Sequence, residues 1–308
     1  MSFIYCSPSG IYGILKLQDL IKTFGFLEFF MRVIHRISES TSNARELMEL
    51  LDLYNVPYDA NYGLCSFDIG EREEYEQRIL ELAQKTHAVD IMHTEYDQAE
   101  YEAASWYTLR SMWHWSYPQP EDGFAYRDLV YNIPCKTCEC GRSQKDLFRV
   151  RFAPKWGPKK YFAMLYWVED ELFAPDKCVE MLRRYQITGF ESLDVVHYKR
   201  GEKIPDLNQL KVTDTIQEGV NKNGPGIRSI GHCPQCGSTL ILANGRPLVW
   251  DKKAFDGLDK DMYKTSDMFG ETSGSHRLLI SKRFYSMLQA EKATRSLVIE
   301  PVFFSECM

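Results

Sequence analysis

The sequence predicts an α+β protein in which a helical N-terminal region, residues 1–120, precedes two related units in residues 121–308. Apolar residues recur at helical spacing in the first part of the chain, and a run of proline and glycine at residues 117–123 ends that pattern. Beyond it, short strand and helix patterns recur together with two cysteine pairs. We therefore expect an internal repeat of about 121–210 and 211–308, each unit comprising a cysteine knuckle, strands, a helix and a strand.

Four segments of the N-terminal region carry apolar residues at helical spacing: 14–37, 43–54, 71–85 and 96–115. In the second segment, Leu47, Leu51 and Tyr54 follow one another at positions i, i+4 and i+7, which places them on one helical face. The sequence therefore predicts a helix for each of the four segments.

The two C-terminal units share a helix pattern. Residues 173–182 align without gaps on residues 279–288, and a residue that favours a helix start occupies the equivalent position in each, Pro175 and Ser281. Each helix pattern is followed by a strand pattern. Four helix positions are expected to be buried: Met181, Leu182, Met287 and Leu288; in the alignment, Cys178, Met181 and Leu182 correspond to Phe284, Met287 and Leu288.

Two C-x-x-C pairs, Cys135 with Cys138 and Cys233 with Cys236, are the strongest chemical signal in the chain. Four thiols in two such knuckles match the ligand set of a tetrahedral structural Zn²⁺. Proline or glycine flanks both pairs, as expected for tight turns between strands. Both ligands of the second pair follow their counterparts by 98 residues (135 to 233 and 138 to 236), which indicates a duplication. The sequence thus predicts one zinc shared by the two units.

Alternatives remain open for the cysteines. Cys140 follows the first pair closely and could replace Cys138 as a ligand, although the C-x-x-C spacing favours Cys138. Reduced, buried thiols are a second interpretation and a redox pair a third. A redox pair usually opens a helix, whereas the residues after Cys236 have a strand pattern. His232 could assist the site as a hydrogen-bond donor or replace a ligand, and a solvent-facing position is the other interpretation.

The C-terminal part resembles the double-CXXCG motif proteins of bacteria, a family that includes immunity proteins that neutralise contact-delivered toxins. The resemblance covers roughly residues 123–304 and implies a structural zinc, no enzymatic activity and a cognate protein toxin as partner. One departure stands in the first knuckle, where Glu139 replaces the glycine that the family pattern has after the second cysteine. The matching motifs are CPQCG at 233–237, LRRYQITGF at 182–190, DMF at 267–269, ISKRF at 280–284 and EPV at 300–302.

Composition places the chain among globular proteins. Its 308 residues are 44% hydrophobic and 26% charged, and the net charge of −6 makes a nucleic-acid backbone an unexpected main partner. Nine cysteines, an odd number, suit a reducing compartment better than a disulfide framework. The N-terminus lacks a signal-peptide pattern, and Glu28 and Arg32 interrupt the apolar stretch 24–34. We expect a cytoplasmic protein without a membrane partner.

Other patterns define weaker candidates. An acidic segment is a candidate contact surface for a basic toxin, with a solvated loop as the plainer interpretation. No nucleophile elbow, metalloprotease motif or phosphate loop occurs, so an enzyme with an unrecognised site is a minor alternative. The aromatic residues from Trp106 to Tyr117 could form a binding platform or core packing. The acidic residues are Asp251, Asp256, Asp259 and Asp261.

An alternative to the toxin-neutralising function, from another functional class, is a zinc-ribbon module that binds nucleic acid or acts in regulation. It requires a basic face with interleaved aromatic side chains, and loss of binding with added salt would identify it. The one candidate stretch comprises Arg149, Arg151, Lys155, Lys159 and Lys160.

Overall fold

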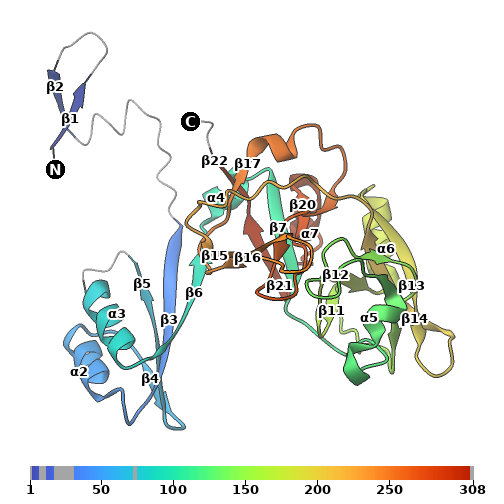
Figure 1. Ribbon diagram of the computed structural model, residues 1–308, viewed down its shortest axis with the longest axis horizontal. Coiled ribbons are helices and arrows are strands. Elements are labelled where there is room, and N and C mark those ends of the chain that lie inside the picture. Colours follow the sequence, from blue (N-terminus) through green and yellow to red (C-terminus); the bar gives the residue numbers. More distant parts are fainter. Residues whose placement is uncertain (1, 7–11, 17–30, 72–74, 306–308) are drawn as a thin grey trace. The chain divides into compact units, whose positions relative to one another are not determined.

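The computed structural model describes residues 2–6, 12–16, 31–71 and 75–305, and of the first two ranges only the backbone (Figure 1). Strands β1 (Ser2–Cys6) and β2 (Tyr12–Lys16) pair antiparallel, with Ser2 opposite Lys16. They belong to a compact unit of their own, and all elements from Arg32 onward belong to a second one.

The prediction of a helical N-terminal region is wrong, because an antiparallel sheet forms much of residues 32–95. Its strands lie in the order β4 (Asp59–Asn61), β5 (Leu64–Gly70), β3 (Arg32–Ser40) and β6 (Val89–Glu95). Helices α2 (Arg45–Leu53) and α3 (Glu76–Lys85) cover one face of this sheet (Figure 1). These two helices fall within the segments predicted to be helical, at 43–54 and 71–85. The fold class is therefore corrected to a sheet-rich α+β chain with several separate sheets.

The helix expected over residues 14–37 is wrong at both ends, since β2 and β3 occupy them; residues 17–30 lie outside the described residues. In β3, the side chains of His35, Ile37 and Glu39 are buried at every second position, the period of a strand. Val33, Ile34 and Ile37 are β-branched and suit a strand. The apolar run alone did not distinguish a strand from a buried helix.

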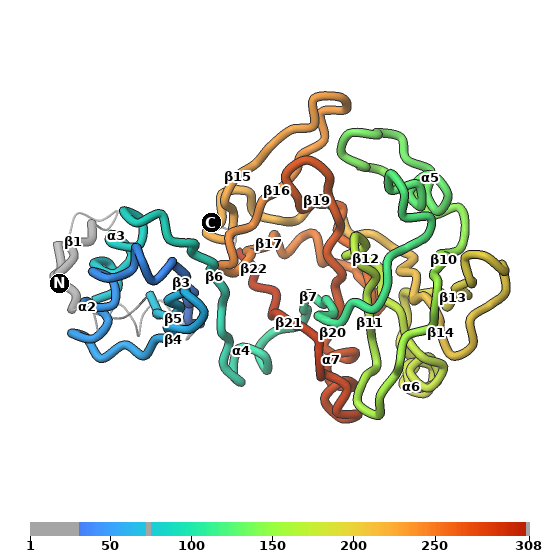
Figure 2. Tube along the Cα trace, turned by 90° about the horizontal axis from the view of Figure 1, so that it is seen from below, coloured from blue at the N-terminus to red at the C-terminus, as the bar shows by residue number. Residues whose placement is uncertain are grey.

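The helix expected over residues 96–115 divides into a short helix and a strand. Helix α4 (Gln98–Ala103) starts at a capping box in which Asp97 and Glu100 bond each other's backbone N–H. Ala104 is extended, and β7 (Trp106–Ser111) follows. β7 pairs on one side with β20 (Leu278–Ser281) and on the other with β21 (Leu297–Pro301), about 170 to 190 residues later in the chain (Figure 2).

Two sheets have matching strand orders. One runs β13 (Phe190–His197), β14 (Lys203–Val212), β12 (Val168–Ala174), β11 (Ala163–Leu165), with β10 (Arg149–Val150) outside β13. The other runs β21, β7, β20, β18 (Met262–Lys264). In each sheet, the strand before the helix and the strand after it both pair antiparallel with one inner strand. In the first sheet β12 and β13 pair with β14, and in the second β20 and β21 pair with β7. The inner strand β14 follows its helix in the sequence, whereas β7 precedes its helix.

Helices α6 (Asp176–Arg184) and α7 (Lys282–Ala290) begin and end in the same way. Their N-caps, Pro175 and Ser281, have nearly identical backbone angles, with φ of −72° and −71° and ψ of 163° in both. Two residues beyond the end of each helix stands a residue with positive φ, Gln186 after α6 and Lys292 after α7. It closes a Schellman-type turn. A strand follows each helix, as the sequence predicts.

One hydrophobic core joins the two helices and both sheets. It contains the four predicted helix positions Met181, Leu182, Met287 and Leu288, all of them buried. Their burial is therefore confirmed. Arg184 and Glu291, at the C-terminal ends of the two helices, form an ion pair of 2.7 Å.

Truncation in this core should destabilise the fold strongly. We expect Leu182→Ala and Leu288→Ala each to lower the free energy of unfolding by about 2–5 kcal/mol, because a cavity replaces a fully buried side chain. Leu53→Ala on α2 is the matched control, since Leu53 is exposed and should change stability little. Urea unfolding of the three variants measures the difference, and equal midpoints for all three would refute this core assignment.

Smaller elements complete the fold and carry the cysteines. The hairpins β8–β9 and β15–β16 are antiparallel, β19 extends the second hairpin, and β17 pairs with β22. Their bounds are β8 (Tyr131–Asn132), β9 (Ser143–Gln144), β15 (Ile227–His232), β16 (Thr239–Ala243), β17 (Val249–Asp251), β19 (Met268–Phe269), β22 (Phe303–Ser305), α5 (Tyr126–Val130) and the 3₁₀ helices η1 (Asp122–Phe124) and η2 (Lys252–Phe255).

Candidate metal centre

Each cysteine pair lies in the turn of a hairpin, the first between β8 and β9 and the second between β15 and β16. The two turns have the same hydrogen bond: the Glu139 N–H donates to the Cys135 carbonyl at 2.9 Å, and the Gly237 N–H donates to the Cys233 carbonyl at 2.8 Å. Glu139 has a φ of +62° and Gly237 a φ of +73°, so both occupy the left-handed region. Glu139 thus adopts the backbone conformation that glycine adopts in the second knuckle.

The two turns bring the four predicted sulfurs together. Cys135 Sγ lies 3.6 Å from Cys233 Sγ, and Cys138 Sγ lies 3.4 Å from Cys236 Sγ. All four lie within 4.8 Å of one another. Sulfurs that surround one Zn²⁺ tetrahedrally at about 2.3 Å are separated by about 3.8 Å. The four cysteines are therefore close enough to bind one metal ion between them.

Cys140 is not one of the four clustered residues. Its backbone N–H donates to Cys138 Sγ at 3.4 Å, so it supports the sulfur that it could have replaced. His232 also stands outside the cluster and is exposed at the end of β15. The structure thus places Cys138, the residue favoured by spacing, beside the other three sulfurs.

Thiol acidity differs between the two knuckles. The side chain and backbone of Ser238 lower the pKa of Cys236 to about 6. Burial alone would raise the pKa of Cys233, but backbone N–H groups of Cys236 and Gln235 bring it below the ordinary value. Burial raises the pKa of Cys138. The thiolate, which is the form that binds metal, is therefore favoured more in the second knuckle than at Cys138.

The knuckles also contact each other through polar side chains. Gln235 Oε1 accepts a hydrogen bond from the Thr137 hydroxyl at 2.7 Å and lies 3.5 Å from Cys135 Sγ. Thr137 and Gln235 lie inside the first and second C-x-x-C turns, respectively. This contact joins the two turns directly through their side chains.

Sequence reasoning missed a buried charge network behind the first knuckle. The buried carboxylate of Glu139 pairs with Arg127 at 2.5 Å and with Arg142 at 2.9 Å. Arg142 also pairs with Asp170 of β12, which is fully buried, at 2.6 Å. The only signal in the sequence was Glu139 itself, at the position equivalent to Gly237 of the second knuckle. This network fastens the first knuckle to the β12 sheet.

Three of the four predicted acidic contact residues are exposed: Asp251, Asp256 and Asp259. Asp251 caps η2 by accepting the Lys253 N–H at 3.0 Å, and Asp259 accepts the Tyr263 hydroxyl at 3.2 Å. Asp256 is the least constrained of the three, since its carboxylate has no hydrogen-bond partner among the described residues. The segment is therefore an accessible acidic loop.

Asp261 is buried and does not belong to that accessible loop. Arg283 Nε donates to its carboxylate at 2.9 Å, and the Thr188 backbone N–H donates at 2.9 Å. Burial alone would raise the pKa of Asp261, but these donors and the Ser281 hydroxyl lower it. The prediction that Asp261 is a partner contact is therefore corrected. Asp261 links the start of α7 to the turn after α6, because donors from Thr188, Ser281 and Arg283 converge on its carboxylate in the folded chain.

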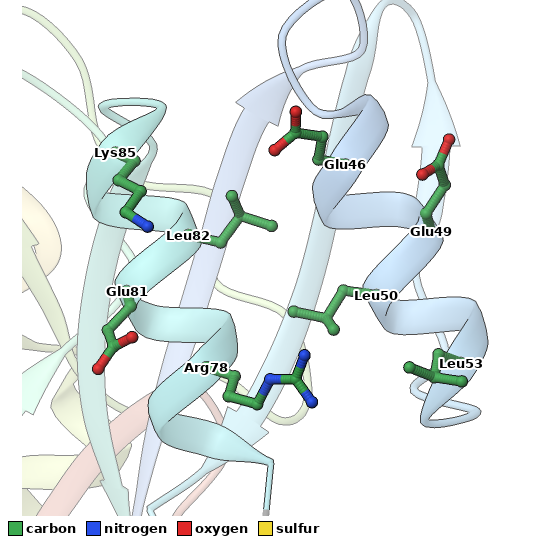
Figure 3. A pocket seen from close by; sticks show the side chains of 8 residues that line it. All are labelled: Glu46, Glu49, Leu50, Leu53, Arg78, Glu81, Leu82 and Lys85. Carbon is green, nitrogen blue, oxygen red and sulfur yellow. The ribbon is translucent and has the colours of Figure 1, made fainter.

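A groove of about 400 Å³ lies between α2 and α3 (Figure 3). Leu50 and Leu82 point toward each other across it, and Glu46, Arg78 and Lys85 lie at its ends (Figure 3). No histidine, cysteine, serine or threonine lines it. A general base beside a nucleophile is therefore lacking in this groove, and we assign it no catalytic role.

Among the described residues, no helix has both the length and the apolar character needed to cross a membrane. No family model matches the chain, and no curated protein matches it.

Proposed function

We propose that this chain is a non-enzymatic binding protein that neutralises a cognate bacterial toxin and that contains one structural Zn²⁺. The observation that carries the metal part is the four-sulfur cluster contributed by two separate hairpins. Soft thiolate ligands in a tetrahedral set favour zinc over the oxygen-seeking cations. Four protein ligands leave no position for water or substrate, so the metal's role is architectural rather than catalytic.

The toxin-neutralising role is supported by the resemblance of residues 123–304 to the double-CXXCG family. The net charge of −6 and the exposed Asp251, Asp256 and Asp259 suit a basic partner, because complementary charge raises the rate of association. A toxin that acts on nucleic acid presents such a basic surface.

Co-expression tests this role. We expect the chain to rescue cells from the protein encoded by the neighbouring gene and to form a one-to-one complex with it, burying about 1,200–2,000 Å². Reversing charge with Asp256→Lys and Asp259→Lys should slow association and weaken rescue, most clearly at low salt. The readouts are cell survival and association rates measured at two salt concentrations.

The matched control is Glu180→Lys, an exposed acidic residue on α6 that changes net charge in the same direction. Equal association rates for the loop variant and the control would remove the acidic loop from the encounter. No rescue by the wild-type chain would reject the toxin-neutralising role itself.

One observation favours the second candidate, a nucleic-acid-binding module. Lys155 and Lys159 are exposed and make no ion pair with the described residues, and Lys160 Nζ lies 3.9 Å from the ring centre of Trp113. Arg149 and Arg151 are less available, because they pair with carboxylates. Titration with single-stranded DNA or RNA at increasing salt decides: binding that falls steeply with salt supports this alternative.

A further inference from the structure

Four aromatic side chains form an exposed patch on the face formed by the β11–β12 turn and η1, which we name the aromatic cluster. The ring centres of Tyr117 and Trp167 lie 4.5 Å apart, those of Tyr117 and Tyr166 4.6 Å, and those of Phe124 and Trp167 4.6 Å. Aromatic rings normally lose most of their accessible surface on folding. The exposed fractions here are 38% for Tyr117, 43% for Phe124, 41% for Tyr166 and 43% for Trp167.

Two members of the aromatic cluster have an unfavourable backbone conformation. Phe124 has a φ of +56° and Trp167 a φ of +67°, in the left-handed region that bulky residues rarely adopt. Trp167 lies in the two-residue turn between β11 and β12, where glycine or asparagine is the usual choice. Strain of this kind is concentrated at functional sites. Fold stability therefore does not explain why large rings occupy both positions.

Two neighbouring residues, Tyr126 and Arg127, hold the aromatic cluster in place. The buried Tyr126 donates its hydroxyl to the Trp167 carbonyl at 3.2 Å. The Arg127 guanidinium lies 4.6 Å from the ring centre of Phe124 and pairs with Glu139 of the first knuckle. The rings are thus presented by a rigid support that includes the metal-binding turn.

The charge beside the aromatic cluster indicates the kind of partner. Arg127 is compensated by the buried Glu139 carboxylate. Asp122, two residues from Phe124, is exposed and makes no ion pair with the described residues, whereas Glu169, two residues from Trp167, lines a pocket with Arg110 and Arg277. Exposed ring faces attract guanidinium and ammonium groups, and the free carboxylate of Asp122 reinforces that attraction. The surface therefore complements cationic side chains.

We propose that the aromatic cluster is the contact surface for the toxin and that it receives arginine or lysine side chains of a basic region on that toxin. The proposal rests on the proposed function and names the site through which it operates. Tyrosine and tryptophan anchors of this kind carry most of the binding energy in protein interfaces. Short-range contacts of this type slow dissociation, whereas the acidic loop acts on the rate of encounter.

Glycine substitutions separate binding from folding at this site. Trp167→Gly and Phe124→Gly remove a ring, and glycine adopts the left-handed backbone without strain, which offsets part of the lost ring packing, so both variants should remain folded in a thermal scan. Affinity for the neighbouring gene product should fall about tenfold or more, mainly through faster dissociation. Trp167→Phe keeps a ring and should retain most of the affinity. Phe152→Ala is the matched control, because Phe152 is exposed but lies outside the aromatic cluster.

The Asp122 carboxylate provides a test of the cationic partner. Asp122→Lys should weaken binding at low salt, and stronger binding of this variant would overturn the assignment of a basic partner. If the wild-type chain rescues cells and Trp167→Gly binds the gene product with undiminished affinity, the aromatic cluster is not the contact surface. The toxin-neutralising role would then still stand. A wild-type chain that neither binds nor neutralises the gene product would reject both. Single-stranded oligonucleotide binding that Trp167→Gly abolishes would also overturn the protein-partner assignment.

Discussion

Replacing Cys233 with serine should remove the metal and unfold the region around the two knuckles. Cys233 is buried between the hairpins and its sulfur lies 3.6 Å from that of Cys135, so one lost ligand opens a site built from four. Structural Zn²⁺ contributes apparent binding free energies on the order of 10 kcal/mol in small domains, which makes this the largest single effect expected. Elemental analysis should find one zinc per wild-type chain and less than that in Cys233→Ser, with a broad or lowered thermal transition.

Cys140→Ser is the control for the metal prediction, because Cys140 lies in the same hairpin but outside the sulfur cluster. This variant should keep its zinc. Loss of zinc in Cys140→Ser together with retention in Cys138→Ser would exchange the two ligand assignments. Wild-type protein prepared without chelators and found free of metal would contradict the metal site altogether.

Replacing Asp170 with asparagine should destabilise the fold by about 3–5 kcal/mol, the range for breaking a buried ion pair by removing one partner. Asp170 is fully buried, and its carboxylate pairs with Arg142 at 2.6 Å. Among the described residues, the variant leaves the guanidinium of Arg142 with Glu139 as its one ion-pair partner and loosens the first knuckle from β12. Chemical denaturation measures the change, and Asp128→Asn, which breaks an exposed pair with Lys136, is the control with little expected effect.

The same residue predicts a direction for the pH dependence. Burial alone would raise the pKa of Asp170, but Lys264 and Arg142 lower it well below the usual range. A lowered folded-state pKa means that the stabilisation is complete above the unfolded-state pKa of about 3.9 and is lost as pH falls through the folded-state pKa. Wild-type stability should therefore decline below about pH 4 more steeply than that of Asp170→Asn. Parallel declines in the two proteins would contradict this contribution.

Local patterns were sufficient for several elements. The apolar spacing of Leu47 and Leu51 predicts α2, and the aligned segments around Met181 and Met287 predict α6 and α7 with their buried positions. The C-x-x-C spacing also identified the four sulfurs that meet. Each of these features depends on residues within one or two helical turns, or on ligand chemistry that requires a fixed spacing.

Other features depended on contacts between distant segments. The residues of β7 have an apolar pattern compatible with a helix, and they form a strand because β20 and β21 offer hydrogen-bonding edges on both sides. Asp261 belongs to an acidic run in the sequence, yet donors from residues 188, 281 and 283 converge on it only in the folded chain. Propensity and charge describe a segment alone and contain no information about such partners.

The sequence by itself determined which four cysteines come together and the helix pair, because C-x-x-C spacing and helical periodicity are properties of short segments. The tertiary structure alone decided that Glu139 joins the knuckle to a buried charge network and that Phe124 and Trp167 present their rings to solvent. Glu139, Phe124 and Trp167 all have positive φ, and the ion pairs and ring contacts around them form only in the folded chain. A local pattern would assign those positions to glycine, and only the surrounding packing and ion pairs stabilise larger residues there.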